Sequence, residues 1–184
     1  MMQMVAGLRS VPAERRGGET ATRMLIETGH RKIAFISGES WMEAADQRLE
    51  GYERALRAAG IPVDPGLIMP GNFLPSDGRA ATLRLLDGPT RPDAIFCAND
   101  LMAVGCYEAL KERGERVGKT MAVMGYDDQE IAQHLTPSLT TMLLPHREMG
   151  HWCISAPLSD SPPEPCQLRL ECPPVVRQSH IKNA

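Results

Sequence analysis

The stretch AIFCANDLMAVG, residues 94–105, indicates a buried strand that is followed at once by a helix. Its first five residues are apolar without alternation, which is typical of a strand covered on both faces in a parallel sheet. Two polar residues, Asn99 and Asp100, end the apolar run, and a helix-like pattern begins directly behind them. In open parallel sheets, ligands bind at the carboxyl ends of the strands. The stretch therefore predicts an α/β fold with an amide and a carboxylate at its ligand-binding edge.

The same pattern of strand and helix recurs along the first two thirds of the chain. Four glycines each end a stretch of helical character: Gly29, Gly60, Gly88 and Gly114. Glycine is common just past a helix because it tolerates the left-handed backbone conformation there. Apolar runs with strand character lie at residues 32–37, 67–71, 94–98 and 121–125. A spacing of roughly 30 residues is typical of βα units, so we expect a parallel sheet flanked by helices.

The composition excludes several classes of protein. A chain of 184 residues with 42% hydrophobic and 23% charged residues is typical of a globular domain or two small lobes. The net charge of −3 argues against a protein that binds nucleic acid by itself. No apolar run is long enough to span a bilayer, and the first residues do not resemble a signal peptide. The five cysteines form no C-x-x-C pair, and an odd number in a chain without an export signal favours reduced thiols in the cytoplasm. We expect no membrane partner, because no apolar run is long enough to span a bilayer.

Polar and aromatic side chains follow the predicted strands and gather at one edge of the sheet. They are Ser37, Arg48, Asn72, Phe73, Asn99, Asp127 and Asp128. Amides, carboxylates and arginine pair with vicinal hydroxyls, and an aromatic face covers the apolar side of a sugar ring, so the set favours a small polyhydroxylated ligand. A second interpretation stays open, in which the Asn and Asp residues only cap helices or form turns.

Other motifs favour neither an enzyme nor a metal site. The stretch GERVGKT, residues 114–120, has one residue too few between its glycines for a phosphate-binding loop, and it leads from a helix into a strand. His146 and His151 are five positions apart, which is a poor helical spacing for shared metal ligands. No nucleophile has an evident base, so we expect no catalysis, no cofactor and no metal.

The helix after Asn99 is apolar on two sides. Leu101 and Val104 belong to one stripe, and Met102 and Cys106 belong to a second. A helix of this kind is either buried in the core or shared with a partner.

Five segments resemble, in order, the effector-binding core of LacI/GalR-type bacterial transcription regulators: TATRMLIETGHRKIAFISG, QRLEGYERALRAAGI, PDAIFCANDLMAVG, VMGYDD and LTPSLTTM. The resemblance covers roughly residues 14–150 and implies two α/β lobes with an effector in the cleft, as in periplasmic sugar-binding proteins. The family's helix-turn-helix head and most of its first lobe are not found in this sequence. We therefore expect an irregular segment at residues 1–13 and one effector-binding lobe at 14–144. Residues 145–184 are expected to form part of a second-lobe helix, a Pro-rich loop and returning edge strands.

The resemblance also implies roles for individual residues. Arg48 is expected to contact effector hydroxyls or a carboxylate, and Phe73 is expected to stack on the effector. Asn99 and Asp127 look like its hydrogen-bonding pair, whereas Asp100 is expected to cap the following helix.

The implied function is that of the sensing part of a transcription regulator whose sugar or nucleoside-like effector modulates operator binding. The family is usually homodimeric, and we expect Met102 and Cys106 to face a partner helix. Operator DNA is expected to bind only through a helix-turn-helix that this sequence lacks. The alternative is a sugar-binding protein of the periplasmic type with no role on DNA.

Overall fold

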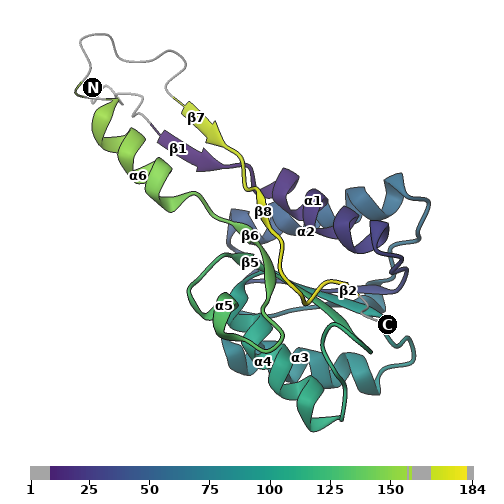
Figure 1. Cartoon of the computed structure of the whole chain (residues 1–184). Coiled ribbons are helices and arrows are strands. Elements are labelled where there is room, and N and C mark those ends of the chain that lie inside the picture. The colour runs from purple at the N-terminus through teal and green to yellow at the C-terminus, as the bar shows by residue number, and fades with distance from the viewer. Residues whose placement is uncertain (1–8, 157, 159–166, 182–184) are drawn as a thin grey trace.

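The computed structural model describes residues 9–156, 158 and 167–181 (Figure 1). Its main body is a six-stranded sheet with the strand order β3-β2-β4-β5-β6-β8. The first five strands run parallel to their neighbours, and β8 runs antiparallel to β6. The strands are β2 (Ile33–Ile36), β3 (Ile68–Met69), β4 (Ala94–Cys97), β5 (Ala122–Asp127), β6 (Thr140–Leu143) and β8 (Pro174–Val175). The helices are α1 (Glu14–Glu27), α2 (Glu43–Ala58), η1 (Pro65–Leu67), α3 (Pro75–Asp87), α4 (Asp100–Glu112) and α5 (Ile131–His134).

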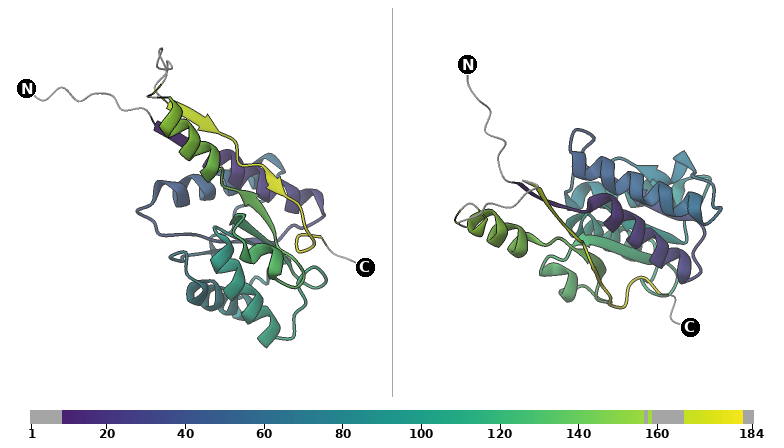
Figure 2. Two further views of the ribbon diagram at one scale, coloured as in Figure 1. Left: turned by 60° about the vertical axis from the view of Figure 1, so that its left-hand side comes forward. Right: turned by 90° about the horizontal axis from the view of Figure 1, so that it is seen from above.

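Two helices cover each face of this sheet. Figure 1 shows α1 and α2 packed together on one face and α3 and α4 on the other. The view from above in Figure 2 looks down on α1 and α2 as they lie over the strands. Every residue of β2 and β4 is buried, which explains why their sequences are apolar without alternation. The predicted fold class, an α/β parallel sheet flanked by helices, is confirmed.

Glycines set the close spacing of both helix pairs. A Cβ atom at Gly51 of α2 would lie 2.1 Å from the carbonyl oxygen of Arg15 in α1. A Cβ atom at Gly105 of α4 would lie 1.8 Å from the carbonyl oxygen of Pro75 in α3. Because backbone meets backbone at both crossings, no larger side chain fits there without moving the helices apart.

The second apolar stripe of α4 belongs to the core. Met102 and Cys106 are both 0% exposed in the single chain. The prediction that they face a partner helix is therefore wrong, since residues without exposed surface cannot contact a second chain. The other stripe, with Leu101, Val104 and Tyr107, is only partly buried.

Three of the four predicted helix-ending glycines adopt the left-handed conformation. Gly29, Gly60 and Gly114 have φ angles of 93°, 70° and 72°. Gly88 also follows its helix directly, but its φ of −75° and ψ of 166° are those of extended backbone. The prediction of a left-handed cap is therefore wrong at Gly88, where the chain leaves the helix toward β4.

A smaller group of elements lies beyond one end of the main sheet in Figures 1 and 2. Strand β1 (Arg9–Pro12) pairs in parallel with β7 (Gln167–Leu170), and α6 (His146–Ser155) packs beside β1. The predicted irregular segment at residues 1–13 is thus corrected at residues 9–12, because the ladder with β7 satisfies their backbone groups. Residues 1–8 and most of the predicted Pro-rich loop lie outside the described residues. In the part of the chain that the structure describes, no helix has the length and apolar character needed to cross a bilayer.

Candidate functional site

The four predicted effector-binding residues are connected at the carboxyl edge of the sheet. Nη2 of Arg48, in α2, lies 3.4 Å from Oδ1 of Asp127, at the end of β5. Nη1 of Arg48 donates a hydrogen bond to the carbonyl oxygen of Ala98, the residue before Asn99. Nδ2 of Asn99 in turn donates to the carbonyl oxygen of Phe73 over 3.1 Å. One chain of contacts therefore joins all four positions.

Arg48 is buried, and a carboxylate that the sequence did not single out holds its guanidinium. Nε of Arg48 donates to Oε2 of Glu14 over 2.7 Å, and Nη2 donates to Oε1 over 3.0 Å. The ring of Tyr126 lies against the same guanidinium, with its centroid 3.8 Å from Cζ. Burial works against the charged form, but the hydrogen bonds and charge of Glu14 outweigh it and raise the pKa of Arg48. The guanidinium is thus fixed in position by the protein itself.

Asp127 has an unusual environment for a carboxylate. Its side chain is only 14% exposed, and its Oδ1 atom is buried without a hydrogen-bond partner among the described residues. Its φ of 104° is uncommon outside glycine, and such strained backbone often lies at functional sites. Burial raises the pKa of Asp127, although the charge of Arg48 opposes this rise. This oxygen has unsatisfied lone pairs but no accessible surface, so a ligand hydroxyl can bond to it only after a small movement of the Asp127 side chain.

Asn99, and not Asp100, is the N-cap of α4. Oδ1 of Asn99 accepts a hydrogen bond from the backbone N–H of Met102 over 2.8 Å. Asp100 instead accepts from Oγ1 of Thr141 over 2.6 Å and from the backbone N–H of Gln129 over 2.8 Å. The predicted cap at Asp100 is therefore wrong, because its carboxylate ties α4 to β6 and to the loop after β5. Burial raises the pKa of Asp100 to about 7.

Two aromatic residues lie on loops at this edge. The ring of Phe73 packs on Gly38, where a Cβ atom would lie 1.9 Å from the ring. Trp41, on the loop between β2 and α2, is 76% exposed, and the sequence did not single it out. It helps to line a cavity of about 440 Å³ with Gly38, Ile68 and Met69. Phe73 is thus partly covered by its own chain, whereas Trp41 presents a free aromatic face.

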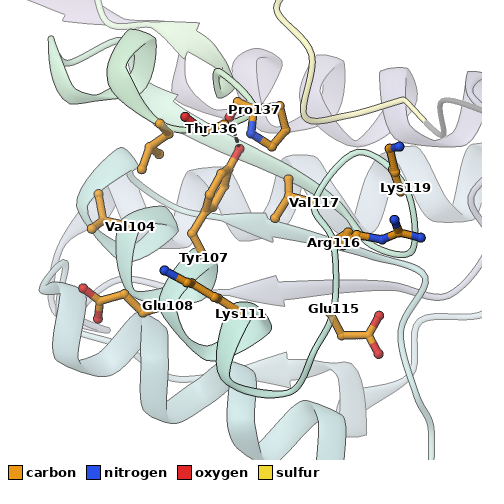
Figure 3. Close-up of a pocket in the computed structure, with 11 residues that line it drawn as sticks. Val104, Tyr107, Glu108, Lys111, Glu115, Arg116, Val117, Lys119, Thr136 and Pro137 are labelled. Atoms are coloured by element: carbon orange, nitrogen blue, oxygen red, sulfur yellow. Dashed lines mark hydrogen bonds between the residues drawn. The ribbon is translucent and has the colours of Figure 1, made fainter.

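A larger cavity, of about 530 Å³, lies away from these residues on the partly buried side of α4 (Figure 3). Val104, Tyr107 and Val117 line it, and the hydroxyl of Tyr107 donates to the carbonyl oxygen of Pro137 over 3.0 Å. Charged side chains surround this apolar floor: Glu108, Lys111, Glu115, Arg116 and Lys119. An apolar centre with a charged rim is typical of a protein–protein interface.

Comparison with known proteins identifies the family to which the chain belongs. Residues 22–180 match the family described as periplasmic binding protein-like domain. The chain belongs to this family. It is 40% identical over 163 residues to the ribose operon repressor of Escherichia coli strain K12, covering 88% of this chain and 49% of the repressor. A LacI-family regulatory protein from Chloroflexus aggregans matches its structure with a TM-score of 0.88 at 34% identity, covering 92% of this chain and 62% of that one. A CelR–cellobiose complex matches with a TM-score of 0.83 at 38% identity, covering 97% and 56%.

This periplasmic-binding-protein-like domain spans about half the length of the curated relatives that it matches. The predicted resemblance to LacI/GalR-type regulators is confirmed by these relatives and structures. The proteins named above are described as transcription regulators or as a repressor.

Proposed function

We propose that this domain is the effector-sensing part of a LacI-type transcription regulator and that it binds a sugar or nucleoside-like molecule. The observation that carries the proposal is the pairing of Arg48 with Asp127, a fixed donor beside a buried acceptor without a hydrogen bond. Vicinal hydroxyls both donate and accept, so they complement such a pair. Asn99 keeps one amide N–H besides the one bonded to Phe73, and Phe73 adds an aromatic ring at the same edge of the sheet. The relatives named for ribose and cellobiose support a sugar as ligand.

We propose that contact with DNA belongs to the part of the regulator's length that lies outside the match between this chain and its relatives. The net charge of −3 offers no general attraction for phosphates, so operator contact requires a helix-turn-helix head. We propose that effector binding in the cytoplasm changes the affinity of such a head for its operator.

We further propose that two copies associate through the partly buried side of α4. The floor of the 530 Å³ cavity provides apolar surface from Val104 and Tyr107 (Figure 3). Glu108 and Lys111 are three residues apart on α4 and both line this cavity. A two-fold axis can therefore bring Glu108 of one copy to Lys111 of the other, which makes the surface complementary to itself.

A titration of the 184-residue chain with neutral monosaccharides, disaccharides and nucleosides tests the binding site. Two-dimensional ¹H–¹⁵N NMR detects the weak binding expected of half a cleft, and it identifies the residues whose signals move. We expect one class of compound to shift the signals of Arg48, Asn99 and Asp127 in a saturable manner. A full panel that leaves these signals unchanged would contradict the proposal.

A reporter assay tests the regulatory role. The chain is joined behind the first half of the Escherichia coli ribose operon repressor, and expression from that repressor's operator is measured. We expect repression that responds to the compound found by NMR and that disappears in the Asp127→Ala variant. Repression that ignores this compound would limit the domain to binding without regulation.

A further inference from the structure

The contact between Glu14 and Arg48 bears on the charge of the effector, and this inference rests on the proposed function. Arginine normally binds phosphates and carboxylates with two parallel hydrogen bonds from neighbouring nitrogens. In this chain, Glu14 already occupies Nε and Nη2 of Arg48, at 2.7 and 3.0 Å. Nη1 is also engaged, by the carbonyl oxygen of Ala98. Three of the five N–H groups of Arg48 are thus bonded within the protein, among them the Nε–Nη2 pair that binds an anion side-on.

The charge of the cluster is no longer positive. Glu14 and Asp127 are two carboxylates beside one guanidinium, so the net charge is −1 when both are ionised. Burial raises the pKa of Asp127, and protonation of that group brings the net charge only to zero. In neither state does Arg48 present an uncompensated positive charge to the cleft.

Neighbouring cations are also matched by acidic groups. Nη2 of Arg177 donates to Oδ1 of Asp128 over 2.8 Å. A cavity of about 210 Å³ beside Glu14 is lined by two arginines, Arg9 and Arg169, and by one further carboxylate, Glu43. These three side chains add one positive charge, which balances the −1 of the ionised cluster, so the site and its surroundings together carry no net positive charge.

We propose that Glu14 makes this site selective for an uncharged polyhydroxylated effector and against its phosphorylated or carboxylated derivatives. A neutral sugar can donate a hydroxyl to the exposed part of the Asp127 carboxylate while Arg48 stays paired. An anion at the same place is repelled by the carboxylate of Asp127 and by that of Glu14, which lies behind the guanidinium. Arg48 cannot turn away from Glu14 to bind the anion without leaving the buried carboxylate of Glu14 unpaired. Glu14 is thus a positioning residue, which holds the guanidinium in place and cancels its charge.

Inorganic phosphate is the probe that tests this role without knowledge of the effector. The chain is titrated with phosphate at pH 8, and the Nε–H signal of Arg48 is followed by NMR. Glu14→Gln removes one negative charge and keeps the shape of the side chain. Glu43→Gln is the matched control, because Glu43 lines the same cavity as Glu14 and bonds to Gln47.

We expect phosphate to bind at Arg48 roughly tenfold more tightly in the Glu14→Gln variant, as one unit charge a few Å away implies. The natural chain and the Glu43→Gln variant should both bind phosphate about tenfold more weakly than Glu14→Gln does, as judged from the same Arg48 signal. Equal phosphate binding in the natural chain and in Glu14→Gln would overturn the proposal. Thermal unfolding of each variant confirms that the comparison is made on folded protein.

The Glu14→Asp variant distinguishes the effect of the negative charge at residue 14 from the effect of its two hydrogen bonds to Arg48. The shorter carboxylate keeps its negative charge but cannot reach both Nε and Nη2, so the Arg48 signal should move while phosphate is still rejected. If Glu14→Asp admits phosphate as well as Glu14→Gln does, charge is not what excludes anions, and the proposal fails.

Matched sugars connect this inference with the proposed function and keep the two distinguishable. Ribose is compared with ribose 5-phosphate, and cellobiose with cellobionate, alongside the compound that the panel identifies and its phosphate ester. Tighter binding of the neutral member at Arg48 and Asp127 supports the inference. Tighter binding of an anionic member overturns it but leaves a sugar site in place. If no sugar binds, the proposed function fails, and the phosphate comparison still decides whether Glu14 excludes anions.

Discussion

Oδ1 of Asp127 lies 3.4 Å from Nη2 of Arg48 and yet accepts no hydrogen bond from any described residue. The two groups attract each other as charges, while the lone pairs of the oxygen stay unsatisfied. Such a buried acceptor lowers the stability of the protein, and a ligand hydroxyl that bonds to it removes that cost.

Replacement of Asp127 by alanine should weaken effector binding. The loss of one buried acceptor contact should cost about 1–3 kcal/mol of binding free energy, which is roughly a 5- to 150-fold loss of affinity. The variant removes the unpaired oxygen together with its attraction to Arg48, so thermal unfolding is measured to confirm that the fold is intact. Asp128→Ala is the control, since Asp128 bonds to Arg177 and not to Arg48. Isothermal titration at equal protein concentration compares the three proteins, and an unchanged affinity in Asp127→Ala would remove Asp127 from the site.

The stability of the fold should depend on the protonation of Asp100. Burial raises the pKa of Asp100 from 3.8 to about 7, so the folded state holds this proton more tightly than the unfolded state does. The stability that this group contributes is therefore complete below pH 4 and is lost as the pH rises toward 7. The shift corresponds to at most roughly 4 kcal/mol. Asp100→Asn lacks this titration, so urea unfolding should show its stability relative to the natural chain increasing between pH 4 and 7.

Asp87→Asn is the control for this pH dependence. The hydrogen bond from Arg113 lowers the pKa of Asp87, so the stability that Asp87 adds is present above pH 4 and is lost as the pH falls. The difference in stability between Asp87→Asn and the natural chain should therefore change with pH only below about pH 4. A flat difference between Asp100→Asn and the natural chain from pH 4 to 7 would show that Asp100 does not titrate in that range.

The sequence predicts the parts of the site that follow from chain position alone. Asn99 and Asp127 are found because strand ends in a parallel sheet must meet at one edge. Glu14 is not found, because an acidic residue in the first turn of a helix is ordinary and complements the helix dipole. Only the packing of α1 on α2 brings it to Arg48. Likewise, the apolar pattern of α4 does not show which of its two stripes faces the core. The choice between Asn99 and Asp100 as the cap of α4 depends on the contacts of Asp100 with β6 and with the loop after β5.

Alanine at Gly51 should destabilise the fold strongly. The new methyl group would lie 2.1 Å from the carbonyl oxygen of Arg15, so α1 and α2 must move apart, at a cost of about 1–3 kcal/mol or more. Gly150→Ala is the matched control, because nothing lies within 4 Å of a Cβ atom there. Within α6, that change should be neutral or stabilising by up to about 1 kcal/mol through helix propensity alone. Thermal unfolding distinguishes the two, and equal stability of both variants would contradict the close crossing of α1 and α2.

Lysine at Met102 and lysine at Val104 should have different effects, because the two residues lie on opposite sides of α4. Met102 is 0% exposed in the core, so Met102→Lys buries an unpaired charge and should unfold the single chain or destabilise it by several kcal/mol. Val104 is partly buried and lines the 530 Å³ cavity, so Val104→Lys should leave the monomer folded and weaken the association of two copies. Circular dichroism follows folding, and analytical ultracentrifugation over a range of concentrations follows association. A folded Val104→Lys variant that still associates like the natural chain would place the interface elsewhere on the surface.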